Sequence, residues 1–386
     1  MFLKKSAKLV LEDGSVFLGF SFGAEKSIAG EVVFSTGMVG YPESFTDPSY
    51  KGQILCLTYP LIGNYGVPSN EKDSYGIPKH FESGKVHIQG LIVSDYSYEY
   101  SHWNAKKSLA EWLKENNVPA IFGIDTRALT KKLREKGAML GKIVVNDNDV
   151  KLYDPNIIDI VREVAIKEPI YFDSDKKTST IIKNDSSIKE INYKTINNGK
   201  NKKNKTVILV DCGVKNNIIR NLLNRNINVI MVPYDYDFFK FKFDGLAISN
   251  GPGDPKMCKK AIENIRKAIG KDFPIFGICL GNQLLALAAG ANTYKLKYGH
   301  RSQNQPCIME GTKRCFITTQ NHGFAVDVKT LPADWEPSFT NINDNTNEGI
   351  RHKKKKIFSS QFHPEATPGP VDTEFLFDDF AKNLGK

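Results

Sequence analysis

The stretch FPIFGICLGNQLLALAA, Phe273–Ala289, joins a short apolar run, a cysteine between two glycines and a run of good helix formers. Its first part, Phe273–Ile278, contains aromatic and β-branched residues and predicts a buried strand. Its last part, Gln283–Ala289, predicts a helix. Cys279 is therefore expected in a sharp turn between strand and helix, where small neighbours avoid backbone clashes.

A cysteine in such a turn is a candidate nucleophile. The dipole at the start of a helix favours the thiolate, so the stretch predicts a nucleophile elbow with sulfur in place of the usual serine oxygen. An inert buried cysteine is the alternative interpretation. A membrane span is not expected, because Gly277, Gly281, Asn282 and Gln283 interrupt the apolar run and a span needs about 20 apolar residues.

The sequence around this stretch alternates between strands and helices. Strands apolar on both faces, alternating with helices, predict an α/β fold whose mostly parallel sheet is covered by helices on both sides. Ligands bind at the carboxyl ends of such strands, where Cys279 and the loop Asn250–Pro255 are expected. The expected strands are 206–210, 229–232, 245–249 and 273–278, and the expected helices are 216–224, 259–269 and 280–289.

The sequence before Val150 has a different pattern, with more strands and fewer helices. Asp13-Gly14 between two apolar runs predicts a hairpin. Ser101–Asn116 has helical composition, and a second helix is expected to begin near Asp125 or Thr126 and end at Gly137. Further strands are expected at 31–36, 54–58, 88–94 and 141–145. This part is predicted to be a strand-rich α+β domain.

These patterns divide the 386 residues into three parts. Residues 1–150 are expected to form the α+β domain that contacts a partner, and residues 206–386 the α/β domain. Residues 151–205 are expected to be a linker, and within it Asp173–Lys205 is rich in Lys and Asn and predicted to be flexible.

Charge and cysteine content narrow the class of protein. The formal net charge of +10 is concentrated in Asp173–Lys205 and Arg351–Lys356, so nucleic-acid binding is not expected. Lys353–Lys356 is predicted to be a solvated turn between two strands. Six cysteines without CxxC spacing argue against a disulfide framework and a zinc site, and they fit a reducing, cytoplasmic location. A targeting segment is not expected at the N-terminus.

A nucleophilic sulfur needs a base and a group that orients it. His363 and Glu365 are two positions apart, and on an extended segment they would point the same way, so Glu365 could orient His363 towards Cys279. His322 is a rival base, ranked lower because no carboxylate lies beside it in the sequence. Backbone N–H groups of Gly253 and Leu280 could form an oxyanion hole.

Three of these motifs together resemble the triad glutamine amidotransferases: Gly277–Gln283, Ser249–Pro255 and Phe362–Glu365. Further segments resemble the glutamine-hydrolysing small subunit of carbamoyl-phosphate synthetase, namely Thr36–Glu43, Thr46–Tyr50, Leu57–Gly66, Asp125–Arg127, Gln320–Phe324 and Pro364–Pro370. The resemblance covers nearly the whole chain except Asp173–Lys205, and the first part and Asp211–Gly213 are most similar to the eukaryotic multifunctional pyrimidine protein. Asn282 stands where many bacterial members have His.

The resemblance implies roles for individual residues. Cys279 would attack the side-chain amide of L-glutamine, His363 would move the proton, and Glu365 would hold His363. Leu280 and Gly253 would stabilise the oxyanion. No metal is expected. The glutamine contacts that the resemblance implies are Ser49, Gly251, Gly253, Leu280, Gln283, Asn321, Gly323 and Phe324.

The resemblance also implies a partner. Ammonia would pass to the large subunit of carbamoyl-phosphate synthetase, or to a fused synthetase domain, which would use bicarbonate, ATP and magnesium. No cofactor is expected in this chain, which has no GxxxxGK[ST] loop. Two alternatives stay open: a catalytically silent module that activates the same synthetase, and an amidotransferase serving another synthetase. The choice between arginine and pyrimidine synthesis is open too.

Overall fold

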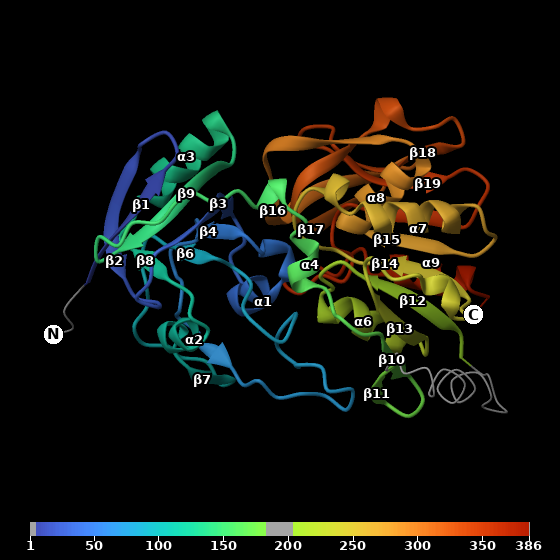
Figure 1. Cartoon of the computed structure of the whole chain (residues 1–386), viewed down its shortest axis with the longest axis horizontal. Coiled ribbons are helices and arrows are strands. Elements are labelled where there is room, and N and C mark those ends of the chain that lie inside the picture. The colour runs from blue at the N-terminus through green and yellow to red at the C-terminus, as the bar shows by residue number, and fades with distance from the viewer. Residues whose placement is uncertain (1–4, 183–203, 386) are drawn as a thin grey trace.

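The computed structural model describes residues 5–182 and 204–385. Two sheets organise it (Figure 1): a closed barrel built by the N-terminal part, drawn in blue and green, and an open sheet built by the C-terminal part, drawn from green to red. They lie side by side along the long axis of the molecule. The α/β class and the strand-rich N-terminal part are as predicted from the sequence.

The barrel has the strand order β1-β2-β8-β6-β4-β3-β9. The predicted hairpin is present, because β1 and β2 pair antiparallel on either side of Asp13-Gly14. The side chains of Leu9, Val32 and Ile54 lie in one buried cluster. Closure of the sheet was not predicted. The barrel strands are β1 (Lys5–Leu11), β2 (Val16–Ser21), β3 (Ile28–Ser35), β4 (Gln53–Leu57), β6 (Gly90–Ile92), β8 (Ala120–Phe122) and β9 (Met139–Val145).

Short elements surround the barrel. Helix α3 (Thr126–Lys136) begins where Asp125 accepts a hydrogen bond from the N–H of Ala128 and ends at Gly137, as predicted. The predicted helix over Ser101–Asn116 is too long, since α2 covers only Leu109–Glu115. A capping box between Ser108 and Glu111 starts this helix. The other elements here are α1 (Tyr41–Thr46), η1 (Pro48–Tyr50), β5 (Val67–Pro68) and β7 (Ala105–Lys107).

The second sheet has the order β11-β10-β13-β12-β14-β15-β20-β19-β18-β16-β17. Its centre is parallel, from β13 (Asn228–Pro233) through β12 (Thr206–Asp211), β14 (Gly245–Ile248) and β15 (Ile275–Ile278) to β20 (Ile357–Ser360). Antiparallel strands extend it at both ends, which the sequence patterns did not predict. One extension contains β16 (Asn292–Met309), β17 (Cys315–Asp327), β18 (Trp335–Asn341) and β19 (Asn347–His352).

Helices cover both faces of the parallel centre, as predicted. Residues of α7 (Lys259–Ile269) and α8 (Leu280–Ala289) belong to the buried cluster on one face. Residues of α6 (Asn216–Asn224) and α9 (Phe375–Asn383) belong to the cluster on the other face. The carboxyl ends of the parallel strands lie on the side of the sheet that faces the barrel (Figure 1).

Part of the predicted linker forms strands. β10 (Ile170–Asp173) pairs antiparallel with β13, and β11 (Thr178–Ile181) pairs with β10, so both extend the second sheet. These two strands were not predicted, and backbone hydrogen bonds of the sheet hold them. The flexibility of Asp173–Lys205 stays a prediction. The rest, 183–203, lies outside the described residues. The domain limits at 150 and 205 stay a prediction. Between them lie η2 (Pro155–Ile157) and α4 (Val161–Val164).

The lysine run behaves as predicted. Lys353–Lys356 forms the turn between β19 and β20, and most of it is exposed to solvent. In the part of the chain that the structure describes, no helix has the length and apolar character needed to span a membrane.

Candidate active site

Cys279 lies in a strained turn between β15 and α8. Its φ of 54° and ψ of −104° are unusual for a residue with a side chain. A Cβ on Gly277 would lie 2.6 Å from the carbonyl oxygen of Gly281, and one on Gly281 would lie 2.3 Å from that of Ile248. Both neighbours must therefore be glycine, and the predicted elbow is present. The thiol is buried, with Sγ 3.6 Å from the carbonyl oxygen of Asn321.

His363 and Glu365 are in contact, as predicted, but not on an extended segment. β20 ends at Ser360, and a turn closed by the hydrogen bond from Ala366 N–H to His363 O brings the two side chains together. His363 Nδ1 lies 2.6 Å from Glu365 Oε1. Burial alone would lower the pKa of His363, but the charges of Glu365 and Cys279 outweigh it and raise the pKa. The imidazolium form of His363 is thus stabilised by the carboxylate of Glu365 and by the thiolate form of Cys279.

Lys215 completes this arrangement, and the sequence analysis missed it. Its Nζ lies 3.1 Å from Glu365 Oε1, and both side chains are buried. Burial raises the pKa of Glu365, but the charges of Lys215 and His363 outweigh burial and lower it to about 2. Glu365 is therefore held as a carboxylate. No local signal identified Lys215, because a lysine before an apolar helix normally lies at the surface.

The glycine loop after β14 lies against the elbow. A Cβ on Gly251 would meet the carbonyl oxygen of Cys212 at 2.1 Å, and Gly253 has a φ of 83°. Both glycines line a cavity beside Cys279. Leu280 is the first residue of α8, where backbone N–H groups have no acceptor within the helix. The loop and the helix start can thus offer N–H donors to an oxygen that develops negative charge.

The cavity beside Cys279 collects nearly all the predicted glutamine contacts, although they come from distant parts of the chain. Leu280 is not among the lining residues and lies directly after Cys279. Those that line the cavity are Ser49, Gly251, Gly253, Gln283, Asn321, Gly323 and Phe324. Ser49 comes from η1, in the N-terminal part, so the cavity lies between the two parts of the molecule.

Buried hydrogen bonds join the two parts at this cavity. Asn250 Nδ2 donates to Ser49 Oγ at 2.8 Å and to Asp47 Oδ1 at 3.2 Å. Asn321 Nδ2 donates to the other oxygen of Asp47 at 3.1 Å. The backbone N–H of Lys215 donates to Asn250 Oδ1 at 3.0 Å, which links the same network to the residue beneath Glu365. The N-terminal part therefore fixes side chains of the site.

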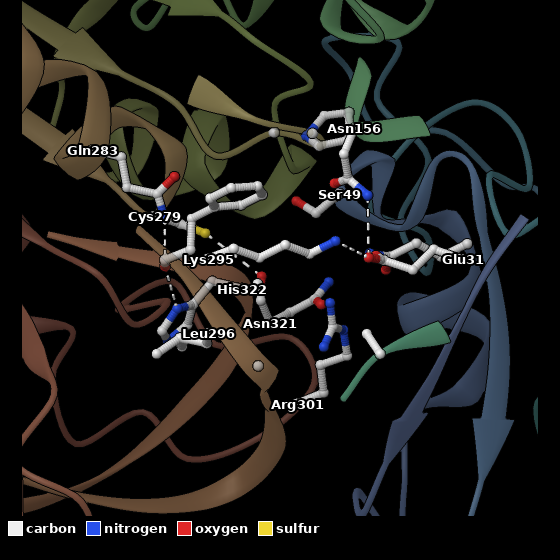
Figure 2. A pocket seen from close by; sticks show the side chains of 18 of the residues that line it. Glu31, Ser49, Asn156, Cys279, Gln283, Lys295, Leu296, Arg301, Asn321 and His322 are labelled. Atoms are coloured by element: carbon white, nitrogen blue, oxygen red, sulfur yellow. Dashed lines mark hydrogen bonds and ion pairs between the residues drawn. The ribbon is translucent and has the colours of Figure 1, made fainter. Parts of the chain in front are cut away.

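The wall opposite the thiol is charged, as Figure 2 shows. Lys295 Nζ lies 2.7 Å from Glu31 Oε1, which also accepts a hydrogen bond from Asn156 at 3.1 Å. The guanidinium of Arg301 is buried on the same side. None of these residues was predicted. They come from β3, from the predicted linker and from β16, and only the fold places them together.

His322, the rival base, also lines the cavity. Its Nδ1 contacts the carbonyl oxygen of Phe324 at 2.8 Å and its Nε2 contacts Gln320 Oε1 at 3.2 Å. Burial is the main cause that lowers its pKa. Both ring nitrogens of His322 are therefore engaged away from the thiol. His363 Nε2 is buried and has no hydrogen-bond partner among the described residues, and Cys279 is one of the causes that raise the pKa of His363. His363 is therefore the better candidate for the partner of Cys279.

Comparison with known families gives matches to two family models. Residues 208–383 match glutamine amidotransferase class-I, and residues 9–143 match the carbamoyl-phosphate synthase small chain, CPSase domain. The first match contains the elbow, the glycine loop and the His363 turn. The second covers the barrel almost completely.

Three curated relatives are similar over nearly the whole chain. Multifunctional protein pyr1-3 of Dictyostelium discoideum is 52% identical over 99% of this chain, which spans 17% of that protein. Carbamoyl-phosphate synthase [ammonia], mitochondrial, of Aquarana catesbeiana is 50% identical over 99% of this chain and 24% of its own length. The carbamoyl phosphate synthase arginine-specific small chain of Debaryomyces hansenii is 49% identical over 98% of this chain, which covers 85% of that protein.

The chain thus covers a small part of the multifunctional relatives and most of a free small chain. The match to the CPSase domain lies in the N-terminal part of the chain, and the match to the amidotransferase domain follows it. With a strained cysteine elbow, a paired histidine and a barrel that closes one side of the cavity, the chain belongs to the carbamoyl-phosphate synthase small-chain family.

Proposed function

We propose that this chain hydrolyses L-glutamine to glutamate and ammonia and passes the ammonia to a synthetase that makes carbamoyl phosphate. The observation that carries the proposal is the position of Cys279, buried in a strained elbow and facing a cavity lined by the predicted glutamine contacts. The family models and the relatives described above support it.

The chemistry follows from the groups present. The Cys279 thiolate attacks the side-chain carbonyl carbon of glutamine, and the carbonyl oxygen takes the negative charge. N–H groups of Leu280 and Gly253 stabilise this oxygen. When the carbon–nitrogen bond breaks, His363 gives its proton to the leaving ammonia, which leaves a thioester on sulfur.

The second half restores the enzyme. Water attacks the thioester carbon while neutral His363 takes its proton, and the carbon–sulfur bond breaks to release glutamate. Glu365 holds Nδ1 of His363 throughout, and Lys215 holds Glu365 as a carboxylate. These steps need only groups of this chain, and no cofactor is proposed for them.

The partner we propose is the large subunit of carbamoyl-phosphate synthetase or a fused synthetase domain. Bicarbonate, ATP and magnesium are proposed to act there, and neither nucleic acid nor a membrane is a proposed partner. We propose a cytoplasmic location because all six cysteines are free thiols, which fits a reducing compartment. Fractionation of cells that produce the tagged chain checks the location.

A silent activating module is the second candidate function. The relative named carbamoyl-phosphate synthase [ammonia] favours it, since that name gives ammonia rather than glutamine. Against it stands the geometry of Cys279, His363 and Glu365, which a silent module would not need.

The two candidates differ in one measurable product. The chain is incubated with glutamine, alone and with its synthetase partner and the substrates of that partner, and glutamate is measured. We expect slow release by the chain alone and faster release in the complex. Intact-protein mass spectrometry after rapid quenching should show the glutamyl thioester on wild type but not on Cys279→Ser. Absence of both glutamate and thioester under all conditions would establish the silent module.

A further inference from the structure

A second cluster of polar side chains lies behind the glutamine cavity, on strands β16, β17 and β19 of the open sheet. His300 on β16 and His322 on β17 are direct partners in the strand register, and their rings lie 4.9 Å apart. Glu348 on β19 joins them: its Oε1 is 3.3 Å from His300 Nδ1 and 3.7 Å from His322 Nε2. All three residues are buried. Figure 2 shows His322 at the edge of the cavity.

The contacts of His322 do not match the one donor and one acceptor of a neutral imidazole. Its Nδ1 lies 2.8 Å from the carbonyl oxygen of Phe324, and its Nε2 lies 3.2 Å from the side-chain oxygen of Gln320. A neutral imidazole carries one N–H and one lone pair. With the Gln320 amide in this orientation an oxygen faces each ring nitrogen, and one of the two contacts places a lone pair against a lone pair.

His300 has the same problem. Its Nε2 lies 2.8 Å from Asp344 Oδ2, while its Nδ1 faces Glu348 Oε1. Oε2 of Glu348 is buried and has no hydrogen-bond partner among the residues that the structure describes. At the centre of the cluster, the Glu348 carboxylate and the ring nitrogens of the histidines thus face acceptor atoms and lack hydrogen-bond donors. A buried group left in this way is costly unless a positive charge compensates it.

His352 shows what a satisfied histidine looks like in the same sheet. Its Nδ1 accepts hydrogen bonds from the backbone N–H groups of Lys354 and Lys355, both at 3.1 Å. Its Nε2 then donates to Asp334 Oδ2 at 3.1 Å. One nitrogen accepts and the other donates, so this histidine needs neither an ion nor an extra proton.

The charges around the cluster also favour a bound cation. Asp344 and Glu348 carry two negative charges, and in the described part of the chain no lysine or arginine forms an ion pair with either of them. If both histidines are neutral, a divalent cation would bring the net charge of the cluster to zero. His300, His322 and Glu348 also lie close enough to share one ion. Among the described residues, they form a group of histidine and acidic side chains whose possible ligand atoms all lie within 4.8 Å of one another.

We propose that His300, His322 and Glu348 bind one Zn²⁺ ion. Nitrogen and oxygen ligands of this type are about 2.1 Å from zinc, so two of them at a tetrahedral angle are about 3.4 Å apart. The separations of 3.3 and 3.7 Å from Glu348 Oε1 fit this value. The site is distinct from the groups that carry the proposed thioester chemistry and was not expected from the sequence, where only cysteine spacing was considered.

Each of the two histidines already has an acceptor for the N–H of its other ring nitrogen. Histidines that bind metal donate their other ring N–H to a carboxylate or a carbonyl oxygen. Asp344 can accept the hydrogen bond from Nε2–H of His300, and the carbonyl oxygen of Phe324 can accept the hydrogen bond from Nδ1–H of His322. The same oxygen accepts a hydrogen bond from Gln283 at 2.8 Å, so the ion would fix side chains that line the glutamine cavity.

A proton is the rival occupant. Burial lowers the pKa of His300, but hydrogen bonds with Asp344 and Glu348 outweigh burial and raise it to about 9. A proton on His300 would balance its two contacts without any metal, although it would leave His322 unsatisfied. The experiment must therefore separate a metal ion from a proton.

The test uses the full chain, stripped with a chelator and titrated with Co²⁺ as a spectroscopic probe for the zinc site. We expect one equivalent to produce the visible d–d bands of a four- or five-coordinate site, without an intense sulfur-to-cobalt charge-transfer band, and Zn²⁺ to displace it. The absence of that band separates this site from binding by Cys279 or the exposed Cys315.

Variants then locate the site. Glu348→Gln keeps the shape of the side chain and should abolish the stoichiometric spectrum. Asp344→Asn, at a partly exposed position, should weaken binding by about 10- to 100-fold without threatening the fold. His352→Asn is the matched control and should bind Co²⁺ like wild type. Thermal unfolding of the stripped proteins checks that each variant folds. If wild type gives no such spectrum, or if Glu348→Gln and Asp344→Asn bind like the control, protons hold the cluster and the zinc proposal is wrong.

Discussion

The two parts of the molecule contribute to the site in different ways. The open sheet supplies every group proposed to react: the thiol of Cys279, the imidazole of His363 and the carboxylate of Glu365. The barrel side supplies Ser49 and Asp47, which touch the cavity and its loops through hydrogen bonds. The difference suggests that the open sheet carries the chemistry and most of the predicted glutamine contacts, whereas the barrel side contributes to holding glutamine through Ser49.

The difference has a structural cause. Parallel strands end together at one edge, so a turn after β15 and another after β20 bring Cys279 and His363 to the same place. The barrel part reaches the cavity through η1 and through residues of two barrel strands, Glu31 of β3 and Gln53 of β4. Changes on the two sides should therefore produce different kinetic signatures.

Cys279→Ser should have the largest effect. Serine keeps the shape of the elbow but is a far weaker nucleophile, and losing one member of a cooperating triad costs nearly as much as losing all of it. We expect glutamine hydrolysis to fall by about four to six orders of magnitude. His363→Asn should behave similarly and Glu365→Gln more mildly.

The control is synthesis of carbamoyl phosphate from added ammonia in the complex, which should persist because the site of the partner is untouched. Glutamine-dependent synthesis near the parental rate in Cys279→Ser would show that the elbow cysteine is not the nucleophile.

Lys215→Met should come next, and it affects both activity and stability. The change leaves Glu365 buried without its cation, and breaking such a buried pair costs about 3–5 kcal/mol. Denaturant unfolding should report this loss, and kcat should fall while KM changes little. A matched control is Lys51→Met, whose ion pair with Glu163 is partly exposed and should matter by less than about 1 kcal/mol. Equal losses in both variants would contradict the role of Lys215.

The stability contributed by Glu365 should depend on pH in a definite direction. Its pKa is lowered to about 2 in the folded chain, against about 4.3 when unfolded. A depressed pKa adds stability above the unfolded value and loses it as pH falls towards the folded value, and this amounts to about 3 kcal/mol. Unfolding free energies of wild type and Glu365→Gln, measured from pH 6 to pH 2, should therefore converge on acidification. A constant difference would mean that Glu365 is not held as a carboxylate.

Ser49→Ala should have the smallest effect and the opposite signature. The hydroxyl accepts one buried hydrogen bond from Asn250, and its loss costs about 1–2 kcal/mol. We expect KM for glutamine to rise by about tenfold with kcat nearly unchanged, measured by glutamate release at saturating and limiting glutamine. A fall in kcat with constant KM would contradict the division of labour between the two parts. Ser44→Ala, also from the N-terminal part but not on the lining of the glutamine cavity, is the control.

Local patterns predicted the elements that local physics controls. The elbow was predictable because glycines on both sides of a cysteine, between an apolar run and helix formers, have few other conformations. Helix α3 was predictable from its caps. The helix over Ser101–Asn116 was overestimated because composition does not show where the capping box at Ser108 begins the helix. The hairpin β10–β11 was missed because β11, an exposed edge strand with the sequence TSTI, resembles a linker in composition.

The sequence by itself determined the α/β class, the position of Cys279 and the pairing of His363 with Glu365, since each depends on residues close together in the chain. Only the tertiary structure decided that Lys215 lies beneath Glu365, that Glu31, Lys295 and Arg301 face the thiol, and that His300, His322 and Glu348 converge behind the cavity. The physical reason is that burial and charge pairing depend on neighbours across strands, and no local spacing encodes which strands become neighbours.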